Sequence, residues 1–336
     1  MLKIVFFEIE PWEKTYLQER IIGHEVEFYE ESINHVESST IYDAEILCVF
    51  ISSVFTKDVL DKFPNLKLIA CMSTGYDHVD LDECNRRGIV VCNVPAYGDN
   101  TVAEHAFGLI LNLARNIHKA YIRTRHEEFS YQGLMGMDLQ GKTLGVLGTG
   151  KIGQHAMRIA KGFGMNIIAY DAYPKDGLDV ELGFRYVSFN ELLRESDVIT
   201  IHVPLTQETF HLIDNDAISR MKDGVLIVNT ARGAIIDTEA LIQGLNSGKI
   251  GGAGLDVLEG ELLIKEEREL THAISTLPKA QLELLLQDHA LMKMPNVIVT
   301  PHLAFYSKEA LLKILDTTLK NVFDLIENRG FENRVS

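Results

Sequence analysis

Apolar residues along this chain follow two alternating patterns. Short apolar runs, typical of buried strands, alternate with stretches in which apolar residues recur every three or four positions, typical of helices. The strand-like runs in the first part of the chain are 3–7, 25–29, 44–51, 66–70 and 88–92. Helical patterns separate several of them, such as 12–22 and 56–63. This βαβα alternation predicts a doubly wound, mostly parallel sheet.

The alternation starts again in the second part of the chain. Its strand-like runs are 144–147, 166–170, 197–203, 224–229, 254–257 and 296–300. Charged or helical stretches separate them, as the crossovers between parallel strands require. The chain therefore predicts an α/β fold with two doubly wound, Rossmann-like parallel-sheet domains and a cleft between them.

Helical patterns outside these strands indicate how the domains are connected. Residues 101–121 carry a broad apolar face, which fits either a crossing helix that also builds a subunit interface or a helix buried in its own core. An amphipathic helix at 307–322 is expected to return to the first domain. The predicted domains are residues 1–98 with 302–336, which form a smaller discontinuous domain, and residues 99–301. The Leu- and Glu-rich segment 259–294 is expected to be a helical insertion near the cleft.

One short segment of the larger domain has the pattern of a phosphate-binding turn. The apolar run 144–147 leads into Gly148-Thr-Gly-Lys-Ile-Gly153, which matches G-x-G-x-x-G, and then into a helical stretch. Gly148 permits the tight turn, Gly150 lets a pyrophosphate approach the backbone, and Gly153 lets the helix pack closely on the strand. The amides at the start of the helix would then bind the phosphates.

A glycine pattern alone has low specificity, but the next predicted strand supports it here. The run 166–170 is followed by Asp171, eighteen residues after Gly153 (171 − 153). A carboxylate at about this distance accepts hydrogen bonds from the ribose hydroxyls of a dinucleotide. The order strand, glycines, helix, strand and acid therefore predicts a dinucleotide site.

Composition and charge argue against several other classes of protein. A net charge of −16 and the lack of a Lys/Arg block disfavour nucleic-acid binding. No apolar run reaches the length of a membrane span and the N-terminus has no signal-peptide pattern, so we expect a cytoplasmic protein without a membrane partner. The four cysteines have no C-x-x-C spacing, so we expect core thiols and no metal site.

Three polar residues that follow predicted strands could act on a substrate beside a bound dinucleotide. Arg232 offers a planar cation that could bind a carboxylate and polarise a ketone. His302 could protonate the alkoxide that forms as hydride arrives, and Glu261 could keep its imidazole protonated. Each also has an ordinary alternative, since Arg232 could bind a helix C-terminus, Glu261 could be a surface residue, and His302 is one of twelve histidines.

Several motifs, taken together and in order, resemble one enzyme family. They are Ser73-Thr-Gly-Tyr-Asp77, Asn100-Thr-Val-Ala-Glu-His-Ala106, Gly148–Gly153, His202-Val-Pro204, Asn229-Thr-Ala-Arg-Gly233, Gly254-Leu-Asp-Val257 and Thr300-Pro-His302. They span nearly the whole chain and resemble the NAD-dependent D-2-hydroxyacid dehydrogenases. Within that family, Asn93-Val-Pro-Ala-Tyr97 and His302-Leu-Ala-Phe-Tyr306 look most like the D-lactate dehydrogenases.

The resemblance implies roles for individual residues. The implied catalytic residues are Arg232, Glu261 and His302, and Glu261 is preferred to Glu259 because it lies five positions after Asp256 (261 − 256). The implied substrate-binding residues are Thr74, Gly75, Tyr97 and Phe305. The implied NAD-binding residues are Gly148, Gly150, Lys151, Ile152, Gly153, Asp171, Val203, Pro204, Thr209, Thr230, Ala231, Arg232 and Asp256.

The resemblance also implies a reaction. NADH would reduce a small 2-keto acid reversibly to the D-2-hydroxy acid, with pyruvate as the first expectation and glyoxylate, hydroxypyruvate or a branched 2-keto acid as alternatives. The chain ends 34 residues after His302 (336 − 302), too few for the regulatory domain of many phosphoglycerate dehydrogenases, which favours an unphosphorylated substrate. A homodimer through the helix near Thr101 is implied. The alternative from another class is an NAD-sensing protein like the family's transcriptional co-repressors, and the lack of basic patches argues against it.

Overall fold

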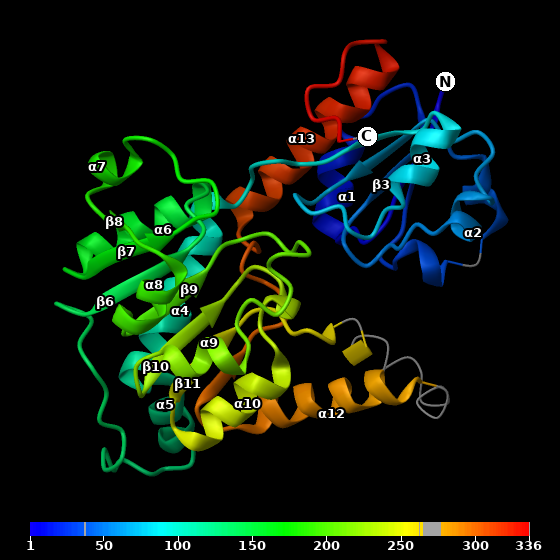
Figure 1. Cartoon of the computed structure of the whole chain (residues 1–336). Coiled ribbons are helices and arrows are strands. Elements are labelled where there is room, and N and C mark those ends of the chain that lie inside the picture. The colour runs from blue at the N-terminus through cyan, green and yellow to red at the C-terminus, as the bar shows by residue number, and fades with distance from the viewer. Residues whose placement is uncertain (37, 262, 265–276, 336) are drawn as a thin grey trace. The chain divides into compact units, whose positions relative to one another are not determined.

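The computed structural model describes residues 1–36, 38–261, 263–264 and 277–335, which form two compact units (Figure 1). The first unit comprises Met1–Tyr97 and Tyr306–Ser336, and the second comprises Gly98–Phe305. Each unit is built on a single parallel sheet with helices around it. The predicted fold class, two parallel-sheet α/β domains, is therefore confirmed.

The sheet of the first unit has the strand order β2-β1-β3-β4-β5. Its strands are Lys3–Phe6 (β1), Glu25–Phe28 (β2), Ile46–Val49 (β3), Leu68–Cys71 (β4) and Val90–Cys92 (β5). Its helices are Pro11–Gln18 (α1), Lys57–Leu60 (α2), Leu81–Arg87 (α3) and Lys308–Ile326 (α13), with short 3-10 turns at Ile33–His35 (η1) and Ser39–Asp43 (η2). Every residue of β3 and β4 is buried, which explains their uninterrupted apolar runs.

Helix α13 attaches the last part of the chain to the first unit, as predicted. It packs against α1 and β4, and its buried Asn321 donates a hydrogen bond to the carbonyl oxygen of Asn93 at 3.1 Å. The residues after α13 run antiparallel beside β5, where the N–H of Val335 donates to the carbonyl oxygen of Val91 at 2.9 Å. The chain's end therefore covers an edge strand, and both termini lie on this unit (Figure 1).

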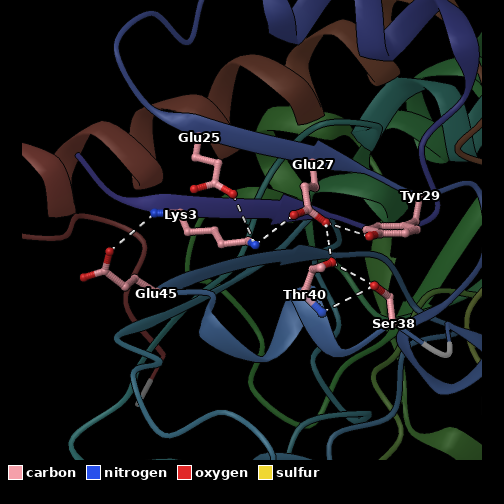
Figure 2. A network of polar contacts seen from close by, with 7 residues as sticks. All are labelled: Lys3, Glu25, Glu27, Tyr29, Ser38, Thr40 and Glu45. Atoms are coloured by element: carbon pink, nitrogen blue, oxygen red, sulfur yellow. Dashed lines mark hydrogen bonds and ion pairs between the residues drawn. The ribbon is translucent and has the colours of Figure 1, made fainter.

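A polar network around Lys3 joins β1 to β2 (Figure 2). The Nζ atom of Lys3 lies 2.8 Å from Glu27 and 3.3 Å from Glu25, and Tyr29 donates to Glu27 at 2.6 Å. The hydrogen bond to Glu27 raises the pKa of Lys3 above its ordinary value, although partial burial opposes the change. Because these charges satisfy one another, we assign the network a structural role.

The sheet of the second unit has the strand order β12-β11-β10-β9-β6-β7-β8. Its strands are Thr143–Leu147 (β6), Asn166–Tyr170 (β7), Arg185–Tyr186 (β8), Val198–Ile201 (β9), Val225–Asn229 (β10), Ile250–Leu255 (β11) and Val297–Val299 (β12). Its helices include Asp99–Arg115 (α4), Ile117–Arg125 (α5), Lys151–Gly162 (α6), Leu178–Leu182 (α7), Phe189–Glu195 (α8), Asn215–Arg220 (α9), Thr238–Ser247 (α10) and Lys279–Lys293 (α12), with a 3-10 turn at Gly233–Ile235 (η3). The strand order reverses at β6, and ligands of open α/β sheets bind beyond the strand ends at such a reversal.

The helix predicted at 101–121 is two helices in the structure. Helix α4 ends at Arg115, and Asn116 has a φ angle of 50°, in the left-handed region where Asn is one of the few tolerated residues. Most apolar residues of α4, such as Ala106, Leu109 and Leu113, are buried in the core of their own unit. The core-helix alternative therefore fits most of α4, whereas Val102 and Leu111 are half-buried.

Strand β11 also differs from its prediction. It begins at Ile250, four residues before the predicted start at Gly254 (254 − 250), because its glycines interrupt the apolar run that a strand usually shows. A Cβ atom on Gly254 would lie 2.9 Å from the Cβ of Leu109 in α4. Glycine is thus used in this strand to let a helix pack closely against the sheet.

The division between the units lies a few residues away from the predicted one. The sequence predicts that residues 302–305 belong to the smaller domain, but the structure includes them in the second unit, as it does Gly98. The carboxylate of Asp256 accepts hydrogen bonds from the N–H groups of Leu303 and Ala304 at 3.0 and 2.8 Å, which ties these residues to the end of β11. Of the predicted helical insertion at 259–294, the part at α12 is helical, and residues 262 and 265–276 lie outside the described residues.

Two further properties of the described residues concern membranes and cysteines. The helices within the described ranges are too short or too polar for any of them to traverse a bilayer. Cys48, Cys71, Cys84 and Cys92 are buried free thiols, and burial raises the pKa of Cys84 to about 11. These thiols are therefore protonated core groups.

Candidate functional site

The chain turns sharply from β6 into α6 through the glycine motif. Gly148 has a φ of 96°, and a Cβ atom there would lie 2.7 Å from the carbonyl oxygen of His202. A Cβ atom on Gly153 would lie 2.1 Å from the carbonyl oxygen of Gly148. Gly150 differs from both, because no heavy atom of the described residues lies within 4 Å of its Cβ position. The fold itself thus requires Gly148 and Gly153, whereas Gly150 leaves the backbone open to a ligand.

The start of α6 offers donors to a ligand at this open turn. Gly150 is the N-cap residue and provides no side chain to bind the first amides of the helix, so these amides can bind an anion. Lys151 follows, with its side chain 65% exposed and its Nζ atom 3.9 Å from Asp99. Ile152 packs against the core.

Asp171 follows the end of β7, beside the glycine turn. Its Oδ2 atom accepts hydrogen bonds from the backbone N–H and the hydroxyl of Thr149, each at 2.7 Å, and its Oδ1 atom accepts one from the N–H of Tyr173 at 2.9 Å. Partial burial disfavours the charge of Asp171, but these hydrogen bonds outweigh it and lower its pKa below the ordinary value. The carboxylate is therefore ionised and oriented next to the turn.

The loop after β9 contains Val203, Pro204 and Thr209. Val203 lies close to the glycine turn, with its Cγ1 atom 3.0 Å from the Cβ position of Gly148. The hydroxyl of Thr209 donates to the carbonyl oxygen of Pro204 at 2.6 Å and accepts from the N–H of Thr206 at 2.7 Å. These bonds of Thr209 hold the loop together, next to the place in the sheet where the strand order reverses.

The loop after β10 carries Thr230, Ala231 and Arg232. The hydroxyl of Thr230 is buried and has no hydrogen-bond partner within the described part of the chain, a costly arrangement unless a bound molecule supplies one. The side chain of Asn229 accepts from the N–H of Ala231 at 3.0 Å and donates to the carbonyl oxygen of Arg232 at 2.8 Å. The backbone that carries Arg232 is therefore fixed at the strand end.

Gly233 brings this loop against the turn that precedes Glu261. A Cβ atom on Gly233 would lie 2.1 Å from the carbonyl carbon of Leu258 and 2.3 Å from the backbone nitrogen of Glu259. The two backbones are therefore in direct contact, which only glycine permits. Arg232 and Glu261 are thus held on two adjoining loops.

Glu261 and His302, which are 41 residues apart in the sequence, are hydrogen-bonded to each other. The Oε1 atom of Glu261 lies 2.8 Å from Nδ1 of His302, and each side chain is 22% exposed. With Nδ1 bonded to a carboxylate, the other ring nitrogen can exchange a proton with a ligand. His302 has a φ of 54°, an unusual backbone conformation for this residue type.

Asp256 supports His302 from the end of β11. Its carboxylate is 1% exposed and accepts hydrogen bonds from the hydroxyl of Thr300 at 2.5 Å and from the N–H groups of the two residues after His302. His105 of α4 lies 3.1 Å from the same hydroxyl. The sequence motif pointed to Asp256 as a cofactor contact and did not predict this supporting role.

Glu259, the alternative to Glu261 in the sequence, has different partners. Its Oε1 atom lies 2.7 Å from Nε2 of His211, and its Oε2 atom accepts from the hydroxyl of Thr238 at 2.9 Å. Glu259 therefore fixes the turn to α10 and the loop before α9, and Glu261 is the acid that contacts His302. Neither His211 nor Thr238 carried a sequence signal for this role, because the contacts join distant segments.

The predicted substrate-binding residues of the first unit lie after β4 and β5. The hydroxyl of Thr74 donates to the carbonyl oxygen of Val94 at 2.8 Å, and the carbonyl oxygen of Thr74 accepts from the side chain of Asn93 at 2.8 Å. The hydroxyl of Ser73 donates to the carbonyl oxygen of Gly75 at 2.6 Å. These hydrogen bonds connect this loop to the residues that follow β5. Tyr97 is half-buried at the end of the first unit, and Phe305 is half-buried at the end of the second.

The second unit thus has the features that a dinucleotide requires. Three features lie just beyond the C-terminal ends of β6, β7 and β10: the open backbone at Gly150, the ionised Asp171 and the buried hydroxyl of Thr230. The Glu261–His302 pair lies beyond the ends of β11 and β12 in the same sheet. These residues fit NAD, and the hydrogen-bonded pair of Glu261 and His302 belongs to the same unit.

Comparison with known proteins places the chain in a family. A family model described as D-isomer specific 2-hydroxyacid dehydrogenase, NAD binding domain, matches residues 107–304. The D-lactate dehydrogenase of Escherichia coli (strain K12) is 40% identical over 341 residues, covering 99% of this chain and 100% of that protein.

Solved structures agree over the full length. The D-lactate dehydrogenase from Aquifex aeolicus complexed with NAD and lactic acid is 37% identical with a TM-score of 0.86, covering 97% of this chain and 96% of that one. The pyruvate reductase of Chlamydomonas reinhardtii is 34% identical with a TM-score of 0.89, covering 99% and 98%. The family predicted from the motifs is confirmed, and this chain belongs to the NAD-dependent D-isomer specific 2-hydroxyacid dehydrogenases.

Proposed function

We propose that this enzyme reduces pyruvate to D-lactate with NADH and catalyses the reverse reaction when D-lactate and NAD are in excess. The observation that carries the proposal is the 2.8 Å contact between Glu261 and His302, since a carboxylate-supported histidine is suited to protonate an alkoxide. The relatives named D-lactate dehydrogenase and pyruvate reductase support lactate and pyruvate as the substrate pair.

Each catalytic residue has its own role in the proposal. Because Nδ1 of His302 is bonded to Glu261, Nε2 is the atom that would give its proton to the substrate oxygen. The charge of Glu261 would stabilise the imidazolium before the transfer. Arg232 would bind the substrate carboxylate and polarise the ketone with its planar guanidinium. Bound NADH supplies the hydride that completes the reduction.

The proposal gives the remaining predicted residues binding roles. Thr74 and Gly75 would offer backbone amides to the substrate carboxylate, and Tyr97 and Phe305 would surround its methyl group. Around the cofactor, Gly148, Gly150, Lys151, Ile152 and Gly153 would contact the pyrophosphate, Asp171 the ribose, and Val203 and Pro204 the adenine, with Thr209, Thr230, Ala231, Arg232 and Asp256 completing the site.

Several other keto acids are close alternatives to pyruvate as the substrate. Glyoxylate, hydroxypyruvate and branched 2-keto acids would undergo the same chemistry. The aromatic side chains of Tyr97 and Phe305 offer no positive charge to a phosphate, so 3-phosphohydroxypyruvate should be a poor substrate. An NAD-sensing protein without turnover is the alternative from another class.

Turnover of a panel of keto acids tests these possibilities. The purified protein is mixed with NADH and each keto acid, and nicotinamide absorbance is followed. The highest kcat/KM is expected for pyruvate, with D-lactate as the product, and His302→Gln should abolish most of the rate, whereas His35→Gln, at an exposed histidine, should not. Higher kcat/KM for 3-phosphohydroxypyruvate would contradict the lactate assignment, and NADH binding without turnover of any keto acid would favour the sensing alternative.

We also propose that the enzyme is a homodimer that acts in the cytoplasm. Helix α5 and the segment after it expose Ile117, Tyr121, Ile122, Phe129, Tyr131 and Met135, with exposed fractions of 49% to 94%. Such a group of exposed large apolar side chains is typical of an interaction surface, and a second copy of the chain is the simplest partner. The four free thiols suit a reducing compartment.

A further inference from the structure

Asp288 of α12 is a fully buried acid that lies next to the turn carrying Glu261. Its side chain is 0% exposed, and its Oδ2 atom accepts the backbone N–H of Gly260 at 2.9 Å. Its other oxygen, Oδ1, is buried without a hydrogen-bond partner in the described ranges. Burial of a carboxyl group costs free energy. The position of Asp288 next to the residue before Glu261 therefore suggests a function for it.

The turn from Leu258 to Glu261 is held at each of its residues. The side chain of Glu259 is bonded to His211 and Thr238, and the N–H of Glu261 donates to the carbonyl oxygen of Leu258 at 3.3 Å. The N–H of Gly260 is bonded to Asp288. A Cβ atom on Gly260 would lie 2.6 Å from the Oδ2 atom of Asp288, so a larger residue at this position would displace the carboxyl group.

We propose that Asp288 is a positioning residue that holds the Gly260 amide and thereby aims Glu261 at His302. This inference rests on the proposed role of the Glu261–His302 pair. Helix α12 contributes none of the proposed catalytic residues. The hydrogen bond between Gly260 and Asp288 connects this helix to the peptide unit directly before Glu261. Without this bond the amide would be buried and unsatisfied, and the turn would relax toward another arrangement.

Asp288 carries a charge that depends on pH. Its pKa is raised to about 6, chiefly by burial, while the hydrogen bond from Gly260 opposes the rise. The charges of Glu259 and Glu261 also raise this pKa, and His289 lowers it. Asp288 is therefore mostly ionised at neutral pH and takes up a proton as the pH falls through about 6. When ionised it adds a negative charge close to the turn that carries Glu261.

Two substitutions separate the hydrogen bond from the charge. Asp288→Asn keeps an oxygen that can accept the Gly260 N–H and removes the charge, whereas Asp288→Ala removes both. We expect Asp288→Ala to lower kcat for pyruvate reduction about tenfold or more with little change in NADH affinity. Asp288→Asn should keep kcat within about threefold, because the accepting oxygen remains. Asp43→Asn, at an exposed aspartate, is the matched control.

A double-mutant cycle shows whether Asp288 acts through Glu261. In a Glu261→Gln background, Asp288→Ala should cause little further loss of kcat, because the group it positions is already gone. Equal losses in both backgrounds, or wild-type kcat in Asp288→Ala, would overturn the proposal. An equal loss in Asp288→Asn and Asp288→Ala would show that the hydrogen bond is not the important contact and would overturn it as well.

A titration of His302 by NMR keeps this test independent of turnover. Histidine ring resonances, assigned with His302→Gln, are followed against pH in the wild type and in Asp288→Ala, which lacks the bond to Gly260, without substrate. A titration of His302 at lower pH in the variant supports the proposal even if the enzyme prefers another keto acid. An identical titration in both proteins, with both folded, contradicts it. Failure of every keto acid to react would instead refute the proposed function.

Discussion

The backbone N–H of His302 donates a hydrogen bond to the carbonyl oxygen of Asp256 at 2.9 Å. Together with the carboxylate of Asp256, which accepts the N–H groups of Leu303 and Ala304, this bond attaches the histidine to the end of β11. The φ of 54° at His302 is an uncommon conformation, and such conformations persist where the surroundings fix them. His302 is therefore positioned by the sheet.

Asp256→Asn should damage this support. An amide at this position replaces one oxygen with an NH₂ group, which cannot accept from a backbone N–H, so at least one of the bonds to Leu303 and Ala304 is lost. We expect kcat to fall at least about tenfold, since the loss of one such bond costs about 1–3 kcal/mol, with a lower Tm. Steady-state kinetics and thermal unfolding measure both effects. Unchanged kcat with a lowered Tm would mean that Asp256 stabilises the fold without positioning His302.

Substitution of the proposed acid should affect chemistry more than cofactor binding. His302→Gln should lower kcat by roughly 10² to 10⁴ and leave NADH affinity nearly intact. In the unmodified enzyme, reduction needs the protonated imidazole and should slow as pH rises, whereas D-lactate oxidation needs the neutral ring and should slow as pH falls. Near-normal kcat in the variant would mean that the proton comes from another group.

Arg232→Lys should produce a different kinetic pattern. The charge remains but the planar guanidinium is lost, so the KM for pyruvate should rise while kcat falls. Steady-state kinetics with pyruvate at saturating NADH measures both parameters. A fall in kcat with an unchanged KM would argue against a contact between Arg232 and the substrate carboxylate.

The ionised, oriented carboxylate of Asp171 should select NADH over NADPH. It can accept hydrogen bonds from ribose hydroxyls and repels a 2′-phosphate. We predict a preference of at least about tenfold in kcat/KM, about 1.4 kcal/mol, and Asp171→Ser should narrow it. Kinetics with the two cofactors measures the ratio, and equal values in the unmodified enzyme would refute the assignment.

Substitutions of two glycines in the turn should affect NADH binding and protein stability separately. Gly150→Ala should fold with nearly normal Tm, because its Cβ position is open, but bind NADH at least about tenfold more weakly, since a methyl group would occupy the space of the pyrophosphate. Gly153→Ala should lower the Tm, because its Cβ would lie 2.1 Å from a carbonyl oxygen. This clash outweighs the gain of about 1 kcal/mol in helix propensity. Calorimetry and NADH fluorescence titration distinguish the two variants, and a normal NADH affinity in Gly150→Ala would argue against a pyrophosphate at this turn.

The exposed apolar residues after α5 should hold a dimer together. Phe129→Ser with Tyr131→Ser should shift the protein toward monomer, because both side chains are 86% exposed in the isolated chain and would be buried in an interface. Light scattering at micromolar concentration measures the mass. Val180→Ser, at a residue 83% exposed on α7, is the control and should stay dimeric. A monomer in the unmodified protein would refute the proposal.

The sequence by itself determined the fold class and the glycine turn, for a local reason. Strand and helix periodicity are properties of neighbouring residues, and parallel buried strands require the uninterrupted apolar runs that the chain shows at β3, β4 and β10. Gly148 and Gly153 could be interpreted correctly because only glycine fits so sharp a turn and so close a contact. The order of these local patterns, joined to motifs along the whole chain, was sufficient to predict the family.

Only the tertiary structure decided which side chains meet. Glu259 and Glu261 are two positions apart and chemically alike, yet one is bonded to His211 and the other to His302. The burial of α4, the support of His302 by Asp256 and the contact of Asp288 with Gly260 likewise join segments distant in the sequence. Such contacts depend on how strands and helices pack, and since packing energy comes from the whole core, no local pattern records it.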